Sequence, residues 1–120
     1  MHHYACSTVP ETANKDPLAD LDGNVRATVR LLEALRRKHG TRLIFPSSGG
    51  TVYGPLRYSP VREDHPLDPI TVYGVSKVAI EKYLGFYRQI HNLDLRIARL
   101  SNPFGVGQNP HGKQGAATTF

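Results

Sequence analysis

At 120 residues, with 39% apolar and 21% charged side chains, the chain has the composition of one globular domain and is too short for two. No apolar run approaches the roughly 18 residues of a membrane span, so a membrane protein is excluded. The net charge of +5 is scattered apart from residues 36–39. We therefore expect no nucleic-acid partner, although an anionic small substrate would suit the positive excess.

Cysteine and histidine usage narrows the class further. Cys6 is the single cysteine, so no internal disulfide can form. Residues 1–20 lack the continuous apolar segment of a secretory signal, and a cytoplasmic location is expected. The six histidines show no metal-ligand spacing with Asp, Glu or Cys, so no metal site is predicted.

The first half of the chain predicts strand, helix and strand. A first strand is expected within residues 1–5, and a helix over 18–38. Its apolar positions recur every three or four residues, namely Leu18, Leu21, Val25, Thr28, Val29, Leu32 and Leu35. Gly40 is expected to end this helix. The short apolar run "TRLIF", residues 41–45, then predicts a buried parallel strand.

The second half predicts loop, helix and strand. Four prolines between residues 54 and 70 indicate an irregular surface loop. A second apolar stripe predicts a helix over 71–91 with Thr71 as its cap. The alternating run "LDLRIARL", residues 93–100, predicts the last strand. Residues 1–120 are thus expected to form one α/β unit, part of a Rossmann-like doubly wound parallel sheet with three strands and two long helices.

Small polar residues, most of them with hydroxyl groups, and glycines follow the expected strands. They are Cys6, Ser7 and Thr8 after the first, Ser47, Ser48, Gly49, Gly50 and Thr51 after the second, and Ser101, Asn102 and Gly105 after the third. Ligands of open α/β sheets bind beyond the carboxyl ends of the strands. Any one of these clusters alone could be turn chemistry, but together they predict a ligand crevice.

Tyr73 and Lys77 are four residues apart in the second expected helix, so their side chains share one face. An ammonium beside a phenol stabilises phenolate, and we therefore expect Lys77 to lower the pKa of Tyr73. The pair would then serve as an acid/base catalyst. Spacing alone fits an ordinary exposed helix pair equally well.

Six stretches, in order, resemble the extended short-chain dehydrogenase/reductases that act on nucleotide sugars, most closely the UDP-glucose 4-epimerase type. The matching stretches are "HYACSTVP", "GNVRATVRLLEAL", "FPSSGGTVYG", "VREDHPLDP", "YGVSKVAIEKYL" and "RLSNPFGVGQNP". The resemblance implies NAD as cofactor and a UDP-hexose as substrate. It also implies a homodimer that pairs through helices 18–38 and 71–91.

The resemblance implies roles for individual positions. Tyr73 would be the catalytic acid/base, and Lys77 would bind the nicotinamide ribose. The implied cofactor-binding residues are Ala5, Asn24, Ser47, Tyr73, Lys77, Ser101 and Pro103. The implied substrate-binding residues are Ser48, Thr51, Tyr73 and Asn102.

One position departs from the family motif. Counting back from Tyr53 and Gly54, the motif's catalytic hydroxyl would fall at Gly49, which has no side chain. We expect Ser48 and Thr51 together to supply that hydroxyl, through a changed loop geometry that the glycines allow.

Two parts of the family pattern are not found in these 120 residues: the amino-terminal glycine fingerprint with its ribose-binding acid, and the carboxyl-terminal substrate lobe. The chain therefore resembles a middle fragment, which we expect to be inactive alone. A non-catalytic truncated paralogue that acts through helix association is the alternative. A nucleotide-sugar dehydratase or reductase is the alternative enzyme, although dehydratases usually place an acidic pair where this chain has Gly50 and Thr51.

Overall fold

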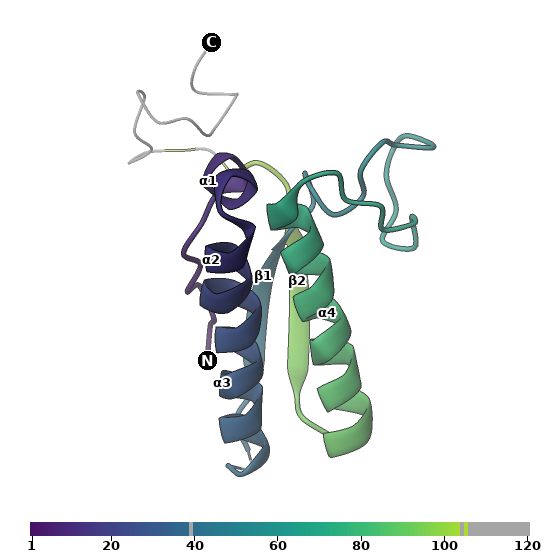
Figure 1. Cartoon of the computed structure of the whole chain (residues 1–120). Coiled ribbons are helices and arrows are strands. Elements are labelled where there is room, and N and C mark those ends of the chain that lie inside the picture. The colour runs from purple at the N-terminus through teal and green to yellow at the C-terminus, as the bar shows by residue number, and fades with distance from the viewer. Residues whose placement is uncertain (39, 104, 106–120) are drawn as a thin grey trace.

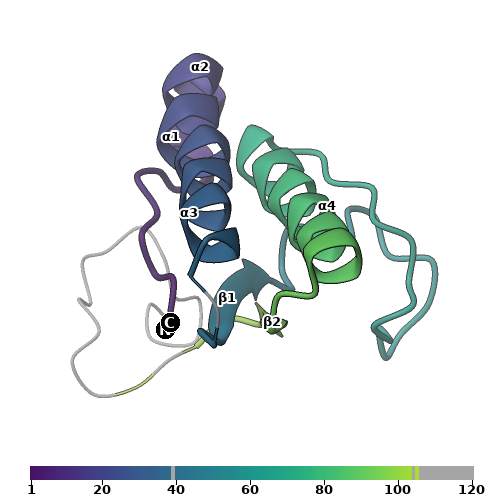
Figure 2. The ribbon, with the colours of Figure 1, turned by 90° about the horizontal axis from the view of Figure 1, so that it is seen from below.

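The computed structural model describes residues 1–38, 40–103 and 105. The elements follow the chain as α1 (Pro10–Lys15), α2 (Pro17–Asp20), the π-helical turn η1 (Leu21–Arg26), α3 (Ala27–Arg36), β1 (Leu43–Ser48), α4 (Val72–His91) and β2 (Leu95–Leu100). The two strands are parallel neighbours, as Figure 1 shows. The α3 and α4 helices lie side by side over one face of this sheet (Figure 2). The expected α/β class is confirmed.

The prediction of a first strand within residues 1–5 is wrong, because this segment forms only an isolated parallel bridge between His2 and Ile44. Two backbone bonds hold it, from His3 N to Ile44 O and from Ile44 N to Met1 O, both 2.9 Å. The chain then leaves the sheet edge, and Ser7 N donates to Asn24 Oδ1 instead. Two bonds are too few for a strand.

The first helical region begins earlier than expected and is interrupted. Pro10 opens α1 and Pro17 opens α2, where proline is tolerated because the first helical N–H groups need no intrahelical acceptor. Asp16 caps α2 by accepting a hydrogen bond from Ala19 N at 3.0 Å. The helix then widens into η1 before α3. Gly40 follows with φ of 82°, the left-handed conformation expected of a glycine after a helix.

The second helix is as expected. Thr71 Oγ1 accepts a hydrogen bond from Gly74 N at 3.1 Å, and Asn92, with φ of 52°, ends the helix.

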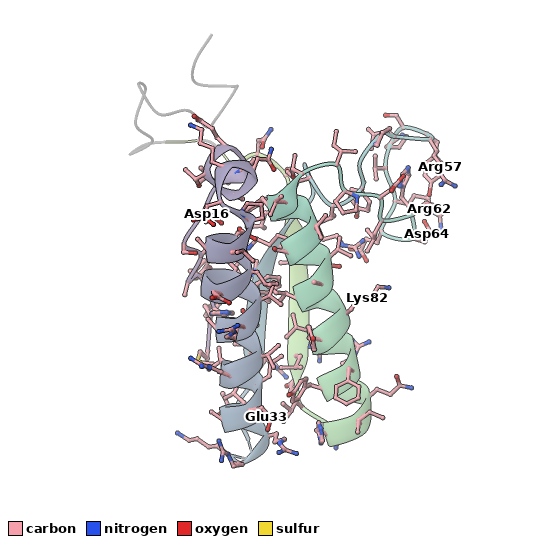
Figure 3. The ribbon with its side chains drawn as sticks, in the orientation of Figure 1. Asp16, Glu33, Arg57, Arg62, Asp64 and Lys82 are labelled. Atoms are coloured by element: carbon pink, nitrogen blue, oxygen red, sulfur yellow. The ribbon has the colours of Figure 1, made fainter. Side chains whose placement is uncertain are left out.

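The core between helices and sheet consists of Val25, Leu32, Leu35, Leu43, Phe45, Ile80, Leu84, Tyr87 and Leu95. Glu33 reaches from α3 towards α4 and accepts a hydrogen bond from the Tyr87 hydroxyl (Figure 3). No helix in the described part of the chain is long and apolar enough to cross a membrane.

Residues 54–70 form the expected irregular loop, which projects beside α4 and carries Arg57, Arg62 and Asp64 (Figure 3). The buried His65 ring holds the loop together, since its Nε2 accepts a hydrogen bond from Arg57 N at 3.0 Å. Arg99 of β2 ties the loop to the sheet by donating to Tyr53 Oη at 3.0 Å and to Glu63 O at 2.8 Å.

Candidate functional site

A pocket of about 470 Å³ lies where the carboxyl ends of β1 and β2 meet the first turn of α4. These strand ends are at the top of the sheet in Figure 1. The expected site residues in the pocket wall are Ser47, Ser48, Thr51, Tyr73, Lys77, Ser101, Asn102 and Pro103. Segments far apart in sequence therefore converge as the strand-end argument predicts. A hollow of about 420 Å³ at the opposite end of the strands adjoins the Arg42–Asp94 ion pair and carries none of the expected site residues.

Tyr73 and Lys77 lie on one face of α4, and Lys77 is only 7% exposed. The Lys77 Nζ lies 5.4 Å from the Tyr73 ring centroid and 4.6 Å from the Phe45 ring centroid. It also donates a hydrogen bond to Pro46 O at 3.0 Å. An ammonium has three donors, so Nζ is anchored to β1 with donors left for a ligand.

The pKa of Tyr73 is shifted in the opposite direction to the one expected. Burial, followed by the nearby Cys6 and Asp20, raises the pKa of Tyr73 to about 12. Burial also lowers the pKa of Lys77, against the opposing effect of Cys6, Asp20 and Glu81. The expectation of a net lowering of the Tyr73 pKa is therefore wrong for this structure, because desolvation dominates. The phenol holds its proton at neutral pH.

The hydroxyl groups around β1 divide between pocket and core. Ser48 and Thr51 contribute to the pocket wall, and Thr51 Oγ1 is buried without a hydrogen-bond partner among the described residues. The Ser47 hydroxyl instead donates to Glu81 Oε1 at 2.5 Å, on the helix side of the sheet. A buried hydroxyl without a partner is costly, so Thr51 can offer an unused hydrogen bond to a ligand.

Position 49 has its own packing constraint. A Cβ added to Gly49 would lie 3.2 Å from Leu100 O and 3.3 Å from Arg99 O. Gly49 N also donates to Leu100 O at 2.6 Å. A side chain there would press on the backbone of β2, so packing favours glycine at this position.

Two expected site residues lie outside the pocket wall. Ala5 is exposed, and Asn24 is buried in η1 behind the pocket. Asn24 Oδ1 accepts a hydrogen bond from Ser7 N at 2.9 Å, and its Nδ2 donates to Thr8 Oγ1 at 2.8 Å. Asn24 therefore shapes the segment beside the pocket from behind.

Sequence reasoning missed several residues of the site. The wall includes Cys6 and Gly50, which the strand-end clusters predicted, and also His3, Tyr4, Pro10, Pro46 and Leu100, which were missed. Behind it lie the buried polar residues Asp20 and Ser76, which it also missed. A signal was present, because Asp20 precedes Asn24 by four residues and Ser76 adjoins Lys77.

Comparison with known proteins gives a consistent family match. The model of the NAD dependent epimerase/dehydratase family matches residues 1–119. The UDP-glucose 4-epimerase of Mycolicibacterium smegmatis is 38% identical over 98% of this chain, and a dTDP-4-dehydro-6-deoxyglucose reductase of Escherichia coli is 40% identical over 98%. The chain spans only 38% and 37% of these two relatives.

Among solved structures, the chain is similar to the UDP-glucose 4-epimerase of Thermus thermophilus in complex with NAD. The TM-score is 0.85 at 34% identity, over 93% of this chain and 36% of the other. The observed arrangement of strands and helices is thus part of a larger fold of the same type.

Proposed function

Because the chain belongs to the NAD dependent epimerase/dehydratase family, we propose that it carries the catalytic segment of an NAD-dependent nucleotide-sugar epimerase of the UDP-glucose 4-epimerase type. The observation that carries the proposal is the pocket that holds Tyr73 and Lys77 together with the hydroxyls of Ser48 and Thr51. An epimerase needs these groups together, namely a proton donor and acceptor, a cation, and a hydroxyl that orients the reacting oxygen.

The residues present fit part of NAD. Lys77 has ammonium donors to spare, and the pocket volume suits a nicotinamide ribose better than a whole dinucleotide. Lys77, Tyr73, Ser47, Ser101 and Pro103 would line that end. Asn24 would hold the adjoining segment through Ser7 and Thr8, and Ala5 lies in that segment between the wall residues Tyr4 and Cys6. NAD would supply reversible hydride transfer at the sugar carbon. These 120 residues contain no G-x-G-x-x-G sequence for the pyrophosphate.

The side chains of this chain would carry the proton chemistry. In its ionised form, Tyr73 Oη takes the proton from the sugar 4-hydroxyl as a 4-keto sugar forms, and returns it when the hydroxyl is restored. The charged Lys77 stabilises the ionised phenol, which has to be formed against its raised pKa. Thr51 Oγ1 or the Ser48 hydroxyl holds the reacting oxygen during the transfer, and Thr51 Oγ1 has no competing partner among the described residues.

Substrate and assembly complete the proposal. The substrate is a UDP-hexose whose phosphates Asn102 would contact from the pocket wall.

Two copies would pair through helices 18–38 and 71–91, where large apolar side chains are exposed. These include Leu18, Leu21, Val75, Phe86 and Ile90. Exposed apolar stripes of this kind favour a protein interface.

The activity test uses the protein at its full natural length. Tyr73→Phe removes the proton-carrying hydroxyl, so UDP-hexose interconversion should fall by about two to four orders of magnitude. Tyr83→Phe is the matched control and should leave the rate unchanged, since Tyr83 is 43% exposed and lies outside the pocket wall. Wild-type interconversion by the Tyr73→Phe enzyme would refute the assigned role.

The exposed helix faces favour the non-catalytic alternative, and one of the relatives favours the reductase. A piece that acts only through helix association would form a stable dimer without turnover, which the same assay detects. A nucleotide-sugar reductase is suggested by the Escherichia coli relative. It would consume reduced cofactor stoichiometrically, whereas an epimerase regenerates it.

A further inference from the structure

Asp20, the last residue of α2, is completely buried. Its Oδ1 accepts hydrogen bonds from Thr8 Oγ1 and from Asn24 Nδ2, the latter at 2.8 Å, and its Oδ2 accepts one from Ser76 Oγ. No Lys or Arg nitrogen in the described part of the chain forms an ion pair with this carboxylate. Burying a carboxylate costs several kcal/mol, which the three hydrogen bonds have to offset.

The three hydrogen bonds join three separate segments. Thr8 belongs to the segment that carries Cys6 and Pro10 into the pocket wall, and Asn24 belongs to η1. Ser76 belongs to α4, between Tyr73 and Lys77. The carboxylate therefore lies where the pocket wall, the π-helical turn and the catalytic turn of α4 meet.

Close packing around η1 leaves these segments little freedom. A Cβ added to Gly23 would lie only 2.3 Å from Ser7 Oγ, so η1 and the 7–8 segment touch. The π-helical turn sets the direction in which Asn24 points relative to Asp20, and such turns recur at functional sites. A loss of the carboxylate would release contacts in all three segments at once.

We propose that Asp20 is a positioning residue, whose buried carboxylate fixes the Tyr73–Lys77 turn of α4 against the segment that brings Cys6 and Pro10 into the pocket wall. This inference rests on the proposed function, because positioning implies a reaction at Tyr73. Asp20 itself touches neither pocket nor ligand and acts through Ser76 and Thr8.

Charge gives the proposal a second consequence. The carboxylate of Asp20 contributes to raising the pKa of Tyr73 and opposes the burial that lowers the pKa of Lys77. The other titratable groups that act on this pair are Cys6 of the amino-terminal segment and Glu81 of α4. Burial and Lys77 in turn lower the pKa of His3. Removing the Asp20 charge alone should make Tyr73 more acidic, which a purely structural role would not do.

The first experiment follows the Tyr73 ring carbon by NMR, in the cofactor-free protein at full natural length with labelled tyrosine. Tyr73→Phe assigns the signal by its disappearance. In Asp20→Asn, the Thr8 and Ser76 hydroxyls can donate or accept, so the cluster stays bonded while its charge is lost. The titration midpoint of Tyr73 should move down by about half a pH unit or more.

Asp22→Asn is the matched control, because Asp22 is an exposed carboxylate two residues away that pairs with Arg26. It should leave the Tyr73 midpoint where the wild type has it. An unchanged midpoint in a folded Asp20→Asn protein would overturn the inference. This readout needs no turnover, so it can fail while the epimerase proposal stands, and the reverse is also possible.

Ser76→Ala tests the positioning directly and decides the question if Asp20→Asn does not fold. It removes the link from Asp20 to α4 and keeps the buried charge. We expect kcat to fall by about tenfold or more with KM little changed, since small displacements of reacting groups are costly. Val78→Ala, two residues further along α4 at a half-buried position outside the pocket wall, is the control and should keep wild-type kcat. A wild-type kcat in Ser76→Ala would contradict the positioning role.

Discussion

Burial of the Tyr73 side chain keeps its hydroxyl protonated far above neutral pH. Desolvation penalises the phenolate, and the positive charge of Lys77 does not overcome it in this structure. Ionisation during a reaction would therefore need further stabilisation from a bound ligand. Without a ligand, the protein therefore holds Tyr73 as a neutral proton donor. A bound ligand would have to stabilise the phenolate before Tyr73 could act as a base.

The raised pKa of Tyr73 predicts a loss of stability in alkaline solution. A free tyrosine ionises near pH 10, whereas Tyr73 does so at about 12 when folded. Between these values the unfolded chain loses the proton and the folded chain keeps it. The stability conferred by the neutral phenol is therefore present below pH 10 and is lost as the pH rises through 12.

Urea unfolding at pH 8, 10 and 11.5 checks this prediction for the wild type and Tyr73→Phe. The Phe variant should lose less stability over that range, because it has no phenol to ionise. Tyr4→Phe, at an exposed position, should follow the wild type. Parallel stability curves for wild type and Tyr73→Phe would contradict the burial effect.

Single residues show what sequence could and could not predict. The shared face of Tyr73 and Lys77 follows from helical spacing and is confirmed. The direction of the Tyr73 pKa shift depends on how much protein covers the ring, which spacing does not encode. Asp20 was missed for a similar reason, since a charged residue is expected on a helix surface unless its partners from distant segments are known.

At the scale of elements, the first turn of α4 is held against the β1 loop by a glycine. A Cβ added to Gly74 would lie 2.6 Å from Thr51 O and 2.9 Å from Pro69 Cβ. The same helix has a second glycine, Gly85, with nothing within 4 Å of an added Cβ. The two positions differ in packing and share a helical backbone.

Alanine at these glycines should therefore have opposite effects. Gly85→Ala should stabilise the protein by about 0.5–1 kcal/mol through helix propensity. Gly74→Ala should destabilise it by about 1–3 kcal/mol, because the Thr51 backbone has to move. Urea midpoints of the two variants give the comparison. A stabilised Gly74→Ala protein would show that the contact with Thr51 is not tight.

Helix and strand predictions succeeded where the periodic pattern was long. The second helix, with its Thr71 cap, and both paired strands are confirmed, although β1 begins at Leu43 and runs on to Ser48, past the expected end at residue 45. The helix predicted over 18–38 corresponds to the contiguous α2, η1 and α3, but the apolar stripe revealed neither the widening at η1 nor the preceding α1. The amino-terminal strand failed because five residues give no usable pattern.

At the scale of the whole molecule, two helices cover one face of a small sheet (Figure 2). The α4 helix also carries large apolar side chains that are exposed. Phe86 is 50% and Ile90 is 61% exposed, one turn apart on α4. If this face pairs with a second copy, Phe86→Glu and Ile90→Glu should each weaken the dimer by at least about tenfold. Gln89→Glu, an exposed polar neighbour, should not.

Sedimentation over a concentration series measures that difference. A wild-type protein that is monomeric throughout would contradict the pairing, as would dimers unaffected by both substitutions. The family and the strand-end pocket could be predicted from the sequence. The oligomeric interface could not, because an apolar stripe serves a core and a dimer equally well.

The central claim is that Tyr73 moves the proton as the sugar is oxidised in this pocket. Rapid mixing of UDP-hexose with the NAD-loaded protein at full natural length, followed by absorbance of the reduced nicotinamide, tests it most directly. We expect a transient reduced cofactor in the wild type that forms at least about a hundredfold more slowly in Tyr73→Phe. Equal rates of reduction in the two proteins would contradict it.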